Sequence, residues 1–223
     1  MNPALVILSR SSKPFRDRLE AGKLLSIALE EFSGPSTVVL GIPRGGVVIA
    51  HQLAQHLKAD LDIVLSRKLG APGNLELAIG AIGETGQIFL NEHLAQQLSI
   101  DPDYIEQERQ HQLNEIHRRC ALFRKIYTKI SLKNKTVIIT DDGIATGATM
   151  QAALWSLRQE GAKEIIVALP VGHQKILEQL TRDAQKVVCL RVPSSLEAIS
   201  QFYTHFTQIT DQEVLDILKK HSQ

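Results

Sequence analysis

Residues 137–149 constrain the fold of this 223-residue chain more than any other stretch. The stretch begins with four strand-forming residues and continues with two adjacent carboxylates, Asp141 and Asp142. A loop of small residues follows, and after it apolar residues recur at spacings of three and four, the pattern of a helix. The sequence therefore predicts a buried strand, a tight loop and the start of a helix.

The loop in this stretch has the composition of an anion-binding site. Glycine and alanine let backbone N–H groups approach an anion closely, and the N-terminus of the following helix adds donors and a favourable dipole. Thr146 and Thr149 can add hydroxyl donors. Because Asp141 and Asp142 would repel a bare phosphate, we expect a ligand that also carries hydroxyls, a divalent metal ion or developing positive charge. The G-x-x-x-x-G-K-[ST] pattern of P-loop nucleotide triphosphatases is missing from the sequence.

The stretch resembles the phosphoribosyl pyrophosphate (PRPP) signature of type I phosphoribosyltransferases in its apolar strand, its acidic pair and the run A-T-G-A-T. The resemblance implies that Asp141 and Asp142 hold the two ribose hydroxyls. It also implies that the loop holds the 5′-phosphate, which would be surrounded by Ala145, Thr146, Gly147, Ala148 and Thr149, and that Gly143 and Ile144 also bind the substrate. The alternative is an ordinary strand-loop-helix turn that is capped by Asp and Thr.

One position departs from some members of the family. In some purine-salvage members the residue before Thr-Gly is an Asp that contacts the base and is proposed as a proton acceptor, and here it is Ala145. Other members lack this acid too. The departure therefore weakens a hypoxanthine or guanine assignment without excluding activity, and the sequence does not name the acceptor base.

Two earlier segments match other parts of the family, in the family's order. The β-branched residues 37–40 lead into the turn P-R-G-G, where the family binds pyrophosphate, often through a strained peptide. The resemblance implies that Arg44, Gly45 and Gly46 contact pyrophosphate there. The alternative is a tight turn with a solvent-facing arginine.

The second of these segments follows the apolar run 61–65, the third predicted strand. Gly, Pro and Asn in residues 66–74 predict a mobile loop after it. Because a flexible loop at this place in the family closes over pyrophosphate, the resemblance makes Arg67 and Lys68 candidates for contacts to the leaving group. We expect two short strands within residues 77–90, at the edge of the sheet.

Three further segments flank these motifs. Residues 15–32 predict a helix whose first turns carry the cations Arg16, Arg18 and Lys23. These side chains could reach an anion, be solvated or pair with the neighbouring acids Asp17 and Glu20. In residues 91–133, Asp101-Pro102 predicts the start of a helix of about 30 residues with a narrow apolar stripe. That helix could lie on the chain's own core, pack against a second subunit or overhang the site.

Near the C-terminus, Phe202 or Tyr203 could stack on a base or pack in the core.

Composition limits the possible partners. The net charge of +1 gives no basic field that would indicate nucleic acid. The apolar segment 4–8 is too short for a signal peptide core or a membrane span. Eight histidines and two distant cysteines show no metal-ligand spacing, so we expect no metal held by the protein alone. We expect the cysteines to be free thiols in a reducing cytoplasm.

Together these observations predict an α/β protein with the type I phosphoribosyltransferase fold, a Rossmann-like parallel sheet flanked by helices. We expect one domain over residues 1–223, with a helical insertion at about 91–133 and a C-terminal hood at about 191–223. We also expect a cytoplasmic homo-oligomer, such as a dimer.

The resemblance implies Mg²⁺-dependent transfer of the 5-phosphoribosyl group from PRPP to a nitrogenous base, with pyrophosphate as leaving group, or the reverse reaction of a nucleoside monophosphate. The expected catalytic residues are Asp141, Asp142, Lys68 and Arg44. Magnesium would arrive with PRPP and lie near Asp141 and Asp142. The alternative is a regulatory protein that senses PRPP or a nucleotide without turnover.

Overall fold

The computed structural model describes residues 4–125 and 127–221, with the side chain of Glu76 excepted. The chain forms two compact units. The first contains Met1–Val64, Lys129–Gly147 and Gly161–Gln223, and the second contains Leu65–Thr128 and Ala148–Glu160. The stretch that resembles the PRPP signature is thus divided: its residues up to Gly147 belong to the first unit, and Ala148 and Thr149 belong to the second.

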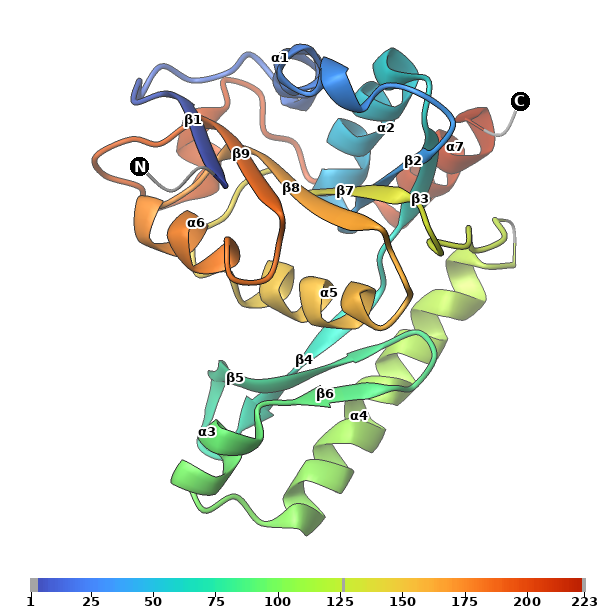
Figure 1. The fold of residues 1–223 in the computed structure, drawn as a ribbon, viewed down its shortest axis with the longest axis vertical. Helices are drawn as coiled ribbons and strands as arrows, with labels where there is room; N and C mark the ends of the chain where they lie inside the picture. The colour runs from blue at the N-terminus through green and yellow to red at the C-terminus, as the bar shows by residue number, and fades with distance from the viewer. Residues whose placement is uncertain (1–3, 126, 222–223) are drawn as a thin grey trace. The chain divides into compact units, whose positions relative to one another are not determined.

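The first unit is built on a six-stranded parallel sheet in the order β1-β9-β8-β7-β2-β3 (Figure 1). Its strands are β1 (Leu5–Ser9), β2 (Thr37–Gly41), β3 (Asp60–Ile63), β7 (Thr136–Thr140), β8 (Glu164–Val171) and β9 (Lys186–Arg191). Every residue of β2 and β7 is buried, as expected for parallel strands covered on both faces. The last residues of these two strands, Gly41 and Thr140, are paired, so the segments after them begin at the same edge of the sheet.

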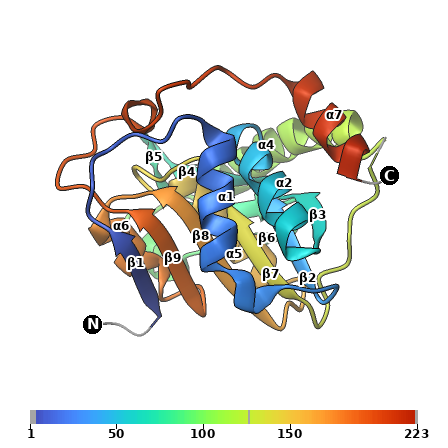
Figure 2. The same cartoon turned by 90° about the horizontal axis from the view of Figure 1, so that it is seen from above.

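Helices cover both faces of this sheet. The helices α1 (Arg18–Ala28) and α2 (Gly45–Leu57) lie side by side on one face, and α6 (Gln174–Leu180) lies on the other (Figures 1 and 2). The helix α7 (Asp211–His221) packs against α2 and β3, and the short 3-10 helices are η1 (Glu30–Phe32) and η2 (Ile199–Phe202). The predicted parallel sheet with flanking helices is confirmed. None of the helices in the described residues is long and apolar enough to cross a membrane.

The second unit has its own three-stranded antiparallel sheet, β4-β5-β6. Its elements are β4 (Ser66–Ala71), β5 (Asn74–Gly83), β6 (Ile88–Leu90), α3 (Glu92–Gln97), α4 (Pro102–Phe123) and α5 (Ala148–Arg158). The prediction of a loop over residues 66–74 is therefore wrong as to secondary structure, because Pro72 and Gly73 form the turn of a hairpin and β4 pairs with β5. The strands predicted within residues 77–90 exist, but they belong to this separate sheet and not to the edge of the parallel one.

The helix α4 begins where the sequence predicted. The Asp101 side chain accepts a hydrogen bond from the Asp103 N–H at 2.9 Å, and Pro102 is the first helical residue. The helix has 22 residues and so is shorter than the predicted length of about 30. Its apolar stripe contacts the unit's own sheet, where Ile116 joins Leu69, Ala71, Ile79 and Ile82 in one buried cluster, with Leu113 and Cys120 packed against it. This part of the stripe therefore covers its own chain and is not an exposed dimer surface.

Replacement of Ile116 by alanine should lower the free energy of unfolding by about 2–4 kcal/mol, because it would leave a cavity in this cluster. The side chain is 1% exposed. Urea unfolding followed by circular dichroism would measure the change. The matched control is Ile88→Ala in the same unit, where the side chain is 41% exposed and the expected loss is below about 1 kcal/mol. Equal losses in the two variants would contradict the packing of α4 on the sheet.

Candidate functional site

Asp141 and Asp142 follow β7 directly, at the edge of the sheet where the strands end. This edge is where open α/β sheets bind their ligands. The Asp142 N–H donates to Asp141 Oδ1 at 2.8 Å, and the Gly46 N–H also donates to the Asp141 carboxyl group. The structure therefore brings the acidic pair against the glycine pair at the start of α2.

The Asp141 carboxyl group lies in an environment that disfavours its charge. Burial, and then the neighbouring charge of Asp142, raise the pKa of Asp141 well above its ordinary value of 3.8. The hydrogen bonds from Asp142 and Gly46 and the charge of Arg18 oppose this shift without cancelling it. A cation or a set of hydroxyl donors would stabilise the ionised carboxylate, and shifted pKa values of this kind occur often at functional sites.

Gly45 and Gly46 let α2 begin against the acidic pair. A Cβ atom on Gly45 would lie 2.0 Å from Asp142 Oδ2, and one on Gly46 would lie 2.8 Å from the Thr140 carbonyl oxygen. Any side chain at either position would force the acidic pair and the helix apart. The close approach of backbone to carboxylate explains the glycine pair without reference to a ligand.

Arg44 immediately precedes α2, and the Pro43–Arg44 peptide bond is cis. The arginine is half-buried. Within the part of the chain that the structure describes, its guanidinium group has no ion-pair partner. The group is therefore free to bind an anion at the sheet edge.

The signature loop is anchored at Ile144 and exposed beyond it. The Ile144 N–H donates to the Val171 carbonyl oxygen at 2.9 Å, and the Ile144 side chain is buried, whereas Ala145 and Thr146 are exposed. Gly147 has φ = 83°, and a Cβ atom there would lie 2.6 Å from Ile176. The loop needs glycine at this position for its own backbone, so a Gly147 variant would not report specifically on phosphate binding.

The side chain of Arg18 completes the surroundings of Asp142. Its Nε and Nη2 atoms donate to Asp142 Oδ2 at 3.0 and 2.8 Å, and its Nη1 donates to the Thr207 carbonyl oxygen at 2.9 Å. The sequence suggested that Arg18 is solvated, paired with neighbouring acids or in contact with an anionic ligand, and the observed partner is Asp142. No local pattern could reveal this pair, because its members are 124 positions apart.

Tyr203 contacts the same aspartate from another side. Its hydroxyl donates to the Asp142 carbonyl oxygen at 2.7 Å, and its ring packs between Phe15 and Phe206. Burial, and then the charge of Asp142, raise the pKa of Tyr203, so the hydroxyl keeps its proton. Phe202 and Tyr203 are both buried, which favours core packing over base stacking.

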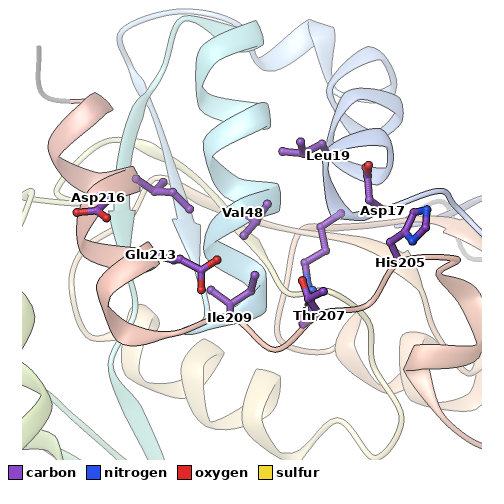
Figure 3. Close-up of a pocket in the computed structure, with 10 residues that line it drawn as sticks. Asp17, Leu19, Val48, His205, Thr207, Ile209, Glu213 and Asp216 are labelled. Atoms are coloured by element: carbon purple, nitrogen blue, oxygen red, sulfur yellow. Dashed lines mark hydrogen bonds between the residues drawn. The ribbon is translucent and has the colours of Figure 1, made fainter.

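A pocket of about 430 Å³ is lined in part by Arg18 and Thr207, which are joined by a hydrogen bond. Figure 3 shows it between the start of α1, Val48 of α2, residues 205–209 and α7. Glu213 and Asp216 lie on one side of it, and Asp17 and His205 lie on the other (Figure 3). None of the site residues predicted from the sequence lines this pocket, although Arg18, the partner of Asp142, does.

The remaining predicted residues lie in the second unit. Arg67 and Lys68 are on β4, where the Arg67 Nε donates to Gln112 Oε1 at 2.9 Å. Ala148 and Thr149 begin α5. The roles of these residues, and of Gly143 in the loop, stay predictions.

No resident metal site is evident in the residues that the structure describes, because none of their His, Cys, Asp and Glu side chains form a group of three or more suited to a metal ion. Magnesium usually binds through one or two carboxylates together with phosphates of the substrate. The half-buried Asp141 and Asp142, with the raised pKa of Asp141, fit a cation of this kind.

Comparison with known proteins identifies the family. The family model of the phosphoribosyl transferase domain matches residues 18–206. Two proteins from strains of Mycobacterium tuberculosis, provisionally named phosphoribosyl transferases, are 41% identical over 208 residues, which are 93% of this chain and 47% of theirs. A crystal structure from Thermus thermophilus is 42% identical with a TM-score of 0.88, covering 93% of this chain and 98% of that one. This chain spans about half the length of the curated Mycobacterium relatives. It belongs to the phosphoribosyl transferase domain family, as its signature predicted.

Proposed function

We propose that the chain transfers the 5-phosphoribosyl group of PRPP to a nitrogenous base, or catalyses the reverse reaction. The observation that carries this proposal is the acidic pair Asp141–Asp142 at the end of β7, held against the glycine pair at the start of α2. The family of the chain and the names of its Mycobacterium relatives support it.

The acidic pair suits two neighbouring hydroxyls. The described contacts of the Asp142 carboxylate use Oδ2, and those of Asp141 include Oδ1. Asp142 can therefore present Oδ1 to a ribose hydroxyl, which donates one hydrogen bond, and Asp141 lies beside it for the neighbouring hydroxyl. Hydroxyl donors would also offset the cost of ionising Asp141.

The 5′-phosphate and the pyrophosphate need separate contacts. The exposed loop at Ala145 and Thr146 offers backbone N–H groups and a hydroxyl for the 5′-phosphate. Arg44 offers a guanidinium group, which can bind pyrophosphate through two parallel hydrogen bonds. Bound with PRPP near Asp141 and Asp142, Mg²⁺ would neutralise part of the charge of the leaving pyrophosphate.

Catalysis of this kind depends on positioning and electrostatics. A nitrogen atom of the base attacks the anomeric carbon, and the bond from that carbon to pyrophosphate breaks with its electron pair on the departing oxygen. The carboxylates stabilise positive charge on the ribose ring, and Arg44 stabilises negative charge on pyrophosphate. The proposed roles of Arg67 and Lys68 as contacts to the leaving group rest on the resemblance to the family alone.

The remaining expectations from the sequence are part of the proposal. They are a single domain over residues 1–223, a helical insertion at about 91–133, a hood at about 191–223, and a cytoplasmic homo-oligomer.

Asp141→Asn and Asp142→Asn should each weaken PRPP binding about tenfold or more, because each removes a charged acceptor at nearly constant volume. Calorimetric titration would measure binding, and pyrophosphate release over a panel of bases would measure turnover. The control is Asp103→Asn, an exposed aspartate on α4. Unchanged PRPP affinity in both variants would refute the ribose assignment. If the wild-type protein binds PRPP but releases no pyrophosphate with any base, the alternative of a regulatory protein that senses PRPP without turnover is favoured.

Asp141→Asn should also raise the melting temperature of the free protein at neutral pH. Because the pKa of Asp141 is raised in the folded state, the folded protein binds this proton more tightly than the unfolded chain, and stability falls as the pH rises above 3.8 towards the folded pKa. Asparagine has no such cost and keeps the acceptor for the N–H groups. The gain should shrink as the pH is lowered from about 7 to about 4, and a gain that is independent of pH would contradict this explanation.

Arg44→Ala should weaken the binding of PRPP and of pyrophosphate about tenfold or more, because it removes charge-assisted hydrogen bonds. A nucleoside monophosphate has no pyrophosphate group and should bind almost unchanged. Calorimetric titration with the three ligands would test this. An equal loss for all three would show that Arg44 supports the structure of the loop.

A further inference from the structure

We propose that Arg18 is a positioning residue for ribose recognition, which fixes the Asp142 carboxylate in the orientation that binds a ribose hydroxyl. The inference rests on the proposed function, because it takes Asp142 as a hydroxyl acceptor. It adds a residue from the start of α1 to a site that the sequence located in the signature and the P-R-G-G turn.

The geometry of the pair restricts Asp142 to one orientation. Two N–H groups of Arg18 converge on the single oxygen Oδ2, at 3.0 and 2.8 Å. The side chains are 8% and 18% exposed, so water competes little for these bonds. A carboxylate held at one oxygen in this way presents Oδ1 in a fixed direction.

Arg18 is itself held on two further sides. Its Nη1 donates to the Thr207 carbonyl oxygen at 2.9 Å, and its Cζ atom lies 3.9 Å from the centre of the Phe206 ring. Arg16, two residues earlier, has a side chain that is 64% exposed and pairs only with the adjacent Asp17 among the described acids. The two arginines therefore differ in environment: the Arg18 side chain is buried and held by several contacts, whereas the Arg16 side chain is exposed.

The backbone of Asp142 is fixed as well as its side chain. Its N–H donates to Asp141 Oδ1 at 2.8 Å, and its carbonyl oxygen accepts the Tyr203 hydroxyl at 2.7 Å. Tyr203, Phe206 and Thr207 come from one segment, which thus contacts Asp142 both directly and through Arg18. With backbone and carboxylate both held, little freedom is left to lose when a hydroxyl binds.

Arg18 has two separable effects on a sugar phosphate. Its charge offsets the repulsion between Asp142 and any anionic ligand, whether or not that ligand carries hydroxyls. Its two hydrogen bonds orient Oδ1, which matters only to a ligand with hydroxyls. The ratio of affinities for two sugar phosphates of equal charge therefore isolates the positioning effect.

The test compares ribose 5-phosphate with 2,3-dideoxyribose 5-phosphate, which lacks both hydroxyls, by calorimetric titration. The wild-type protein should prefer ribose 5-phosphate about tenfold or more, and Arg18→Met should reduce this preference to about threefold or less. Arg18→Lys should give an intermediate value, because an ammonium group keeps the charge but cannot reproduce two N–H bonds from one planar group. The matched control Arg16→Met should keep the wild-type preference.

The outcomes separate this inference from the proposed function. If Asp142→Asn removes the preference but Arg18→Met keeps it, or weakens both ligands equally, Arg18 is only structural and the inference is wrong. If Arg18→Met does not fold, Arg18→Lys decides, and a wild-type preference in that variant overturns the inference. If the wild-type protein shows no preference, the ribose assignment itself fails, and if Asp142→Asn keeps the preference, the assignment of Asp142 to a ribose hydroxyl fails.

Discussion

Two adjacent carboxylates at the edge of a buried sheet repel each other, and each loses favourable interactions with water. The contacts of the first unit around Asp141 and Asp142 offset part of this cost. Asp142 receives the guanidinium group of Arg18, and Asp141 receives N–H donors from Asp142 and Gly46. The compensation is incomplete, because the pKa of Asp141 remains raised. A site that leaves part of this electrostatic cost in place favours ligands that bring hydroxyl donors or a cation.

The parallel sheet brings the necessary parts to one place. The strands β2 and β7 are neighbours, and their last residues are paired, so the segments that follow them meet although they lie far apart in the chain. The glycines after β2 let α2 start against the acids after β7. The segment after β9 then supplies Tyr203 and Thr207, which fix Asp142 directly and through Arg18. Segments that follow three strands, β2, β7 and β9, thus meet at the acidic pair.

The predictions from the sequence were wrong or undecided where one residue pattern is compatible with two kinds of structure. Gly and Pro at positions 70–73 indicated a mobile loop, but two of them form the turn of a hairpin whose flanking residues Leu69 and Ala71 are buried. The stripe on α4 indicated either a core or an interface, because an apolar face looks the same in both cases. Only the presence of a second sheet for it to cover decided between them.

The sequence alone determined the strand, the acidic pair, the loop and the capped helix starts, because each depends on residues within a few positions of one another. It also indicated the family through that local order. The tertiary structure decided which strands are neighbours, that the chain has a second sheet, and that Arg18 and Tyr203 hold Asp142. Those partners are 124 and 61 positions away from it, and no local spacing encodes a contact whose members are joined only by the folding of the chain.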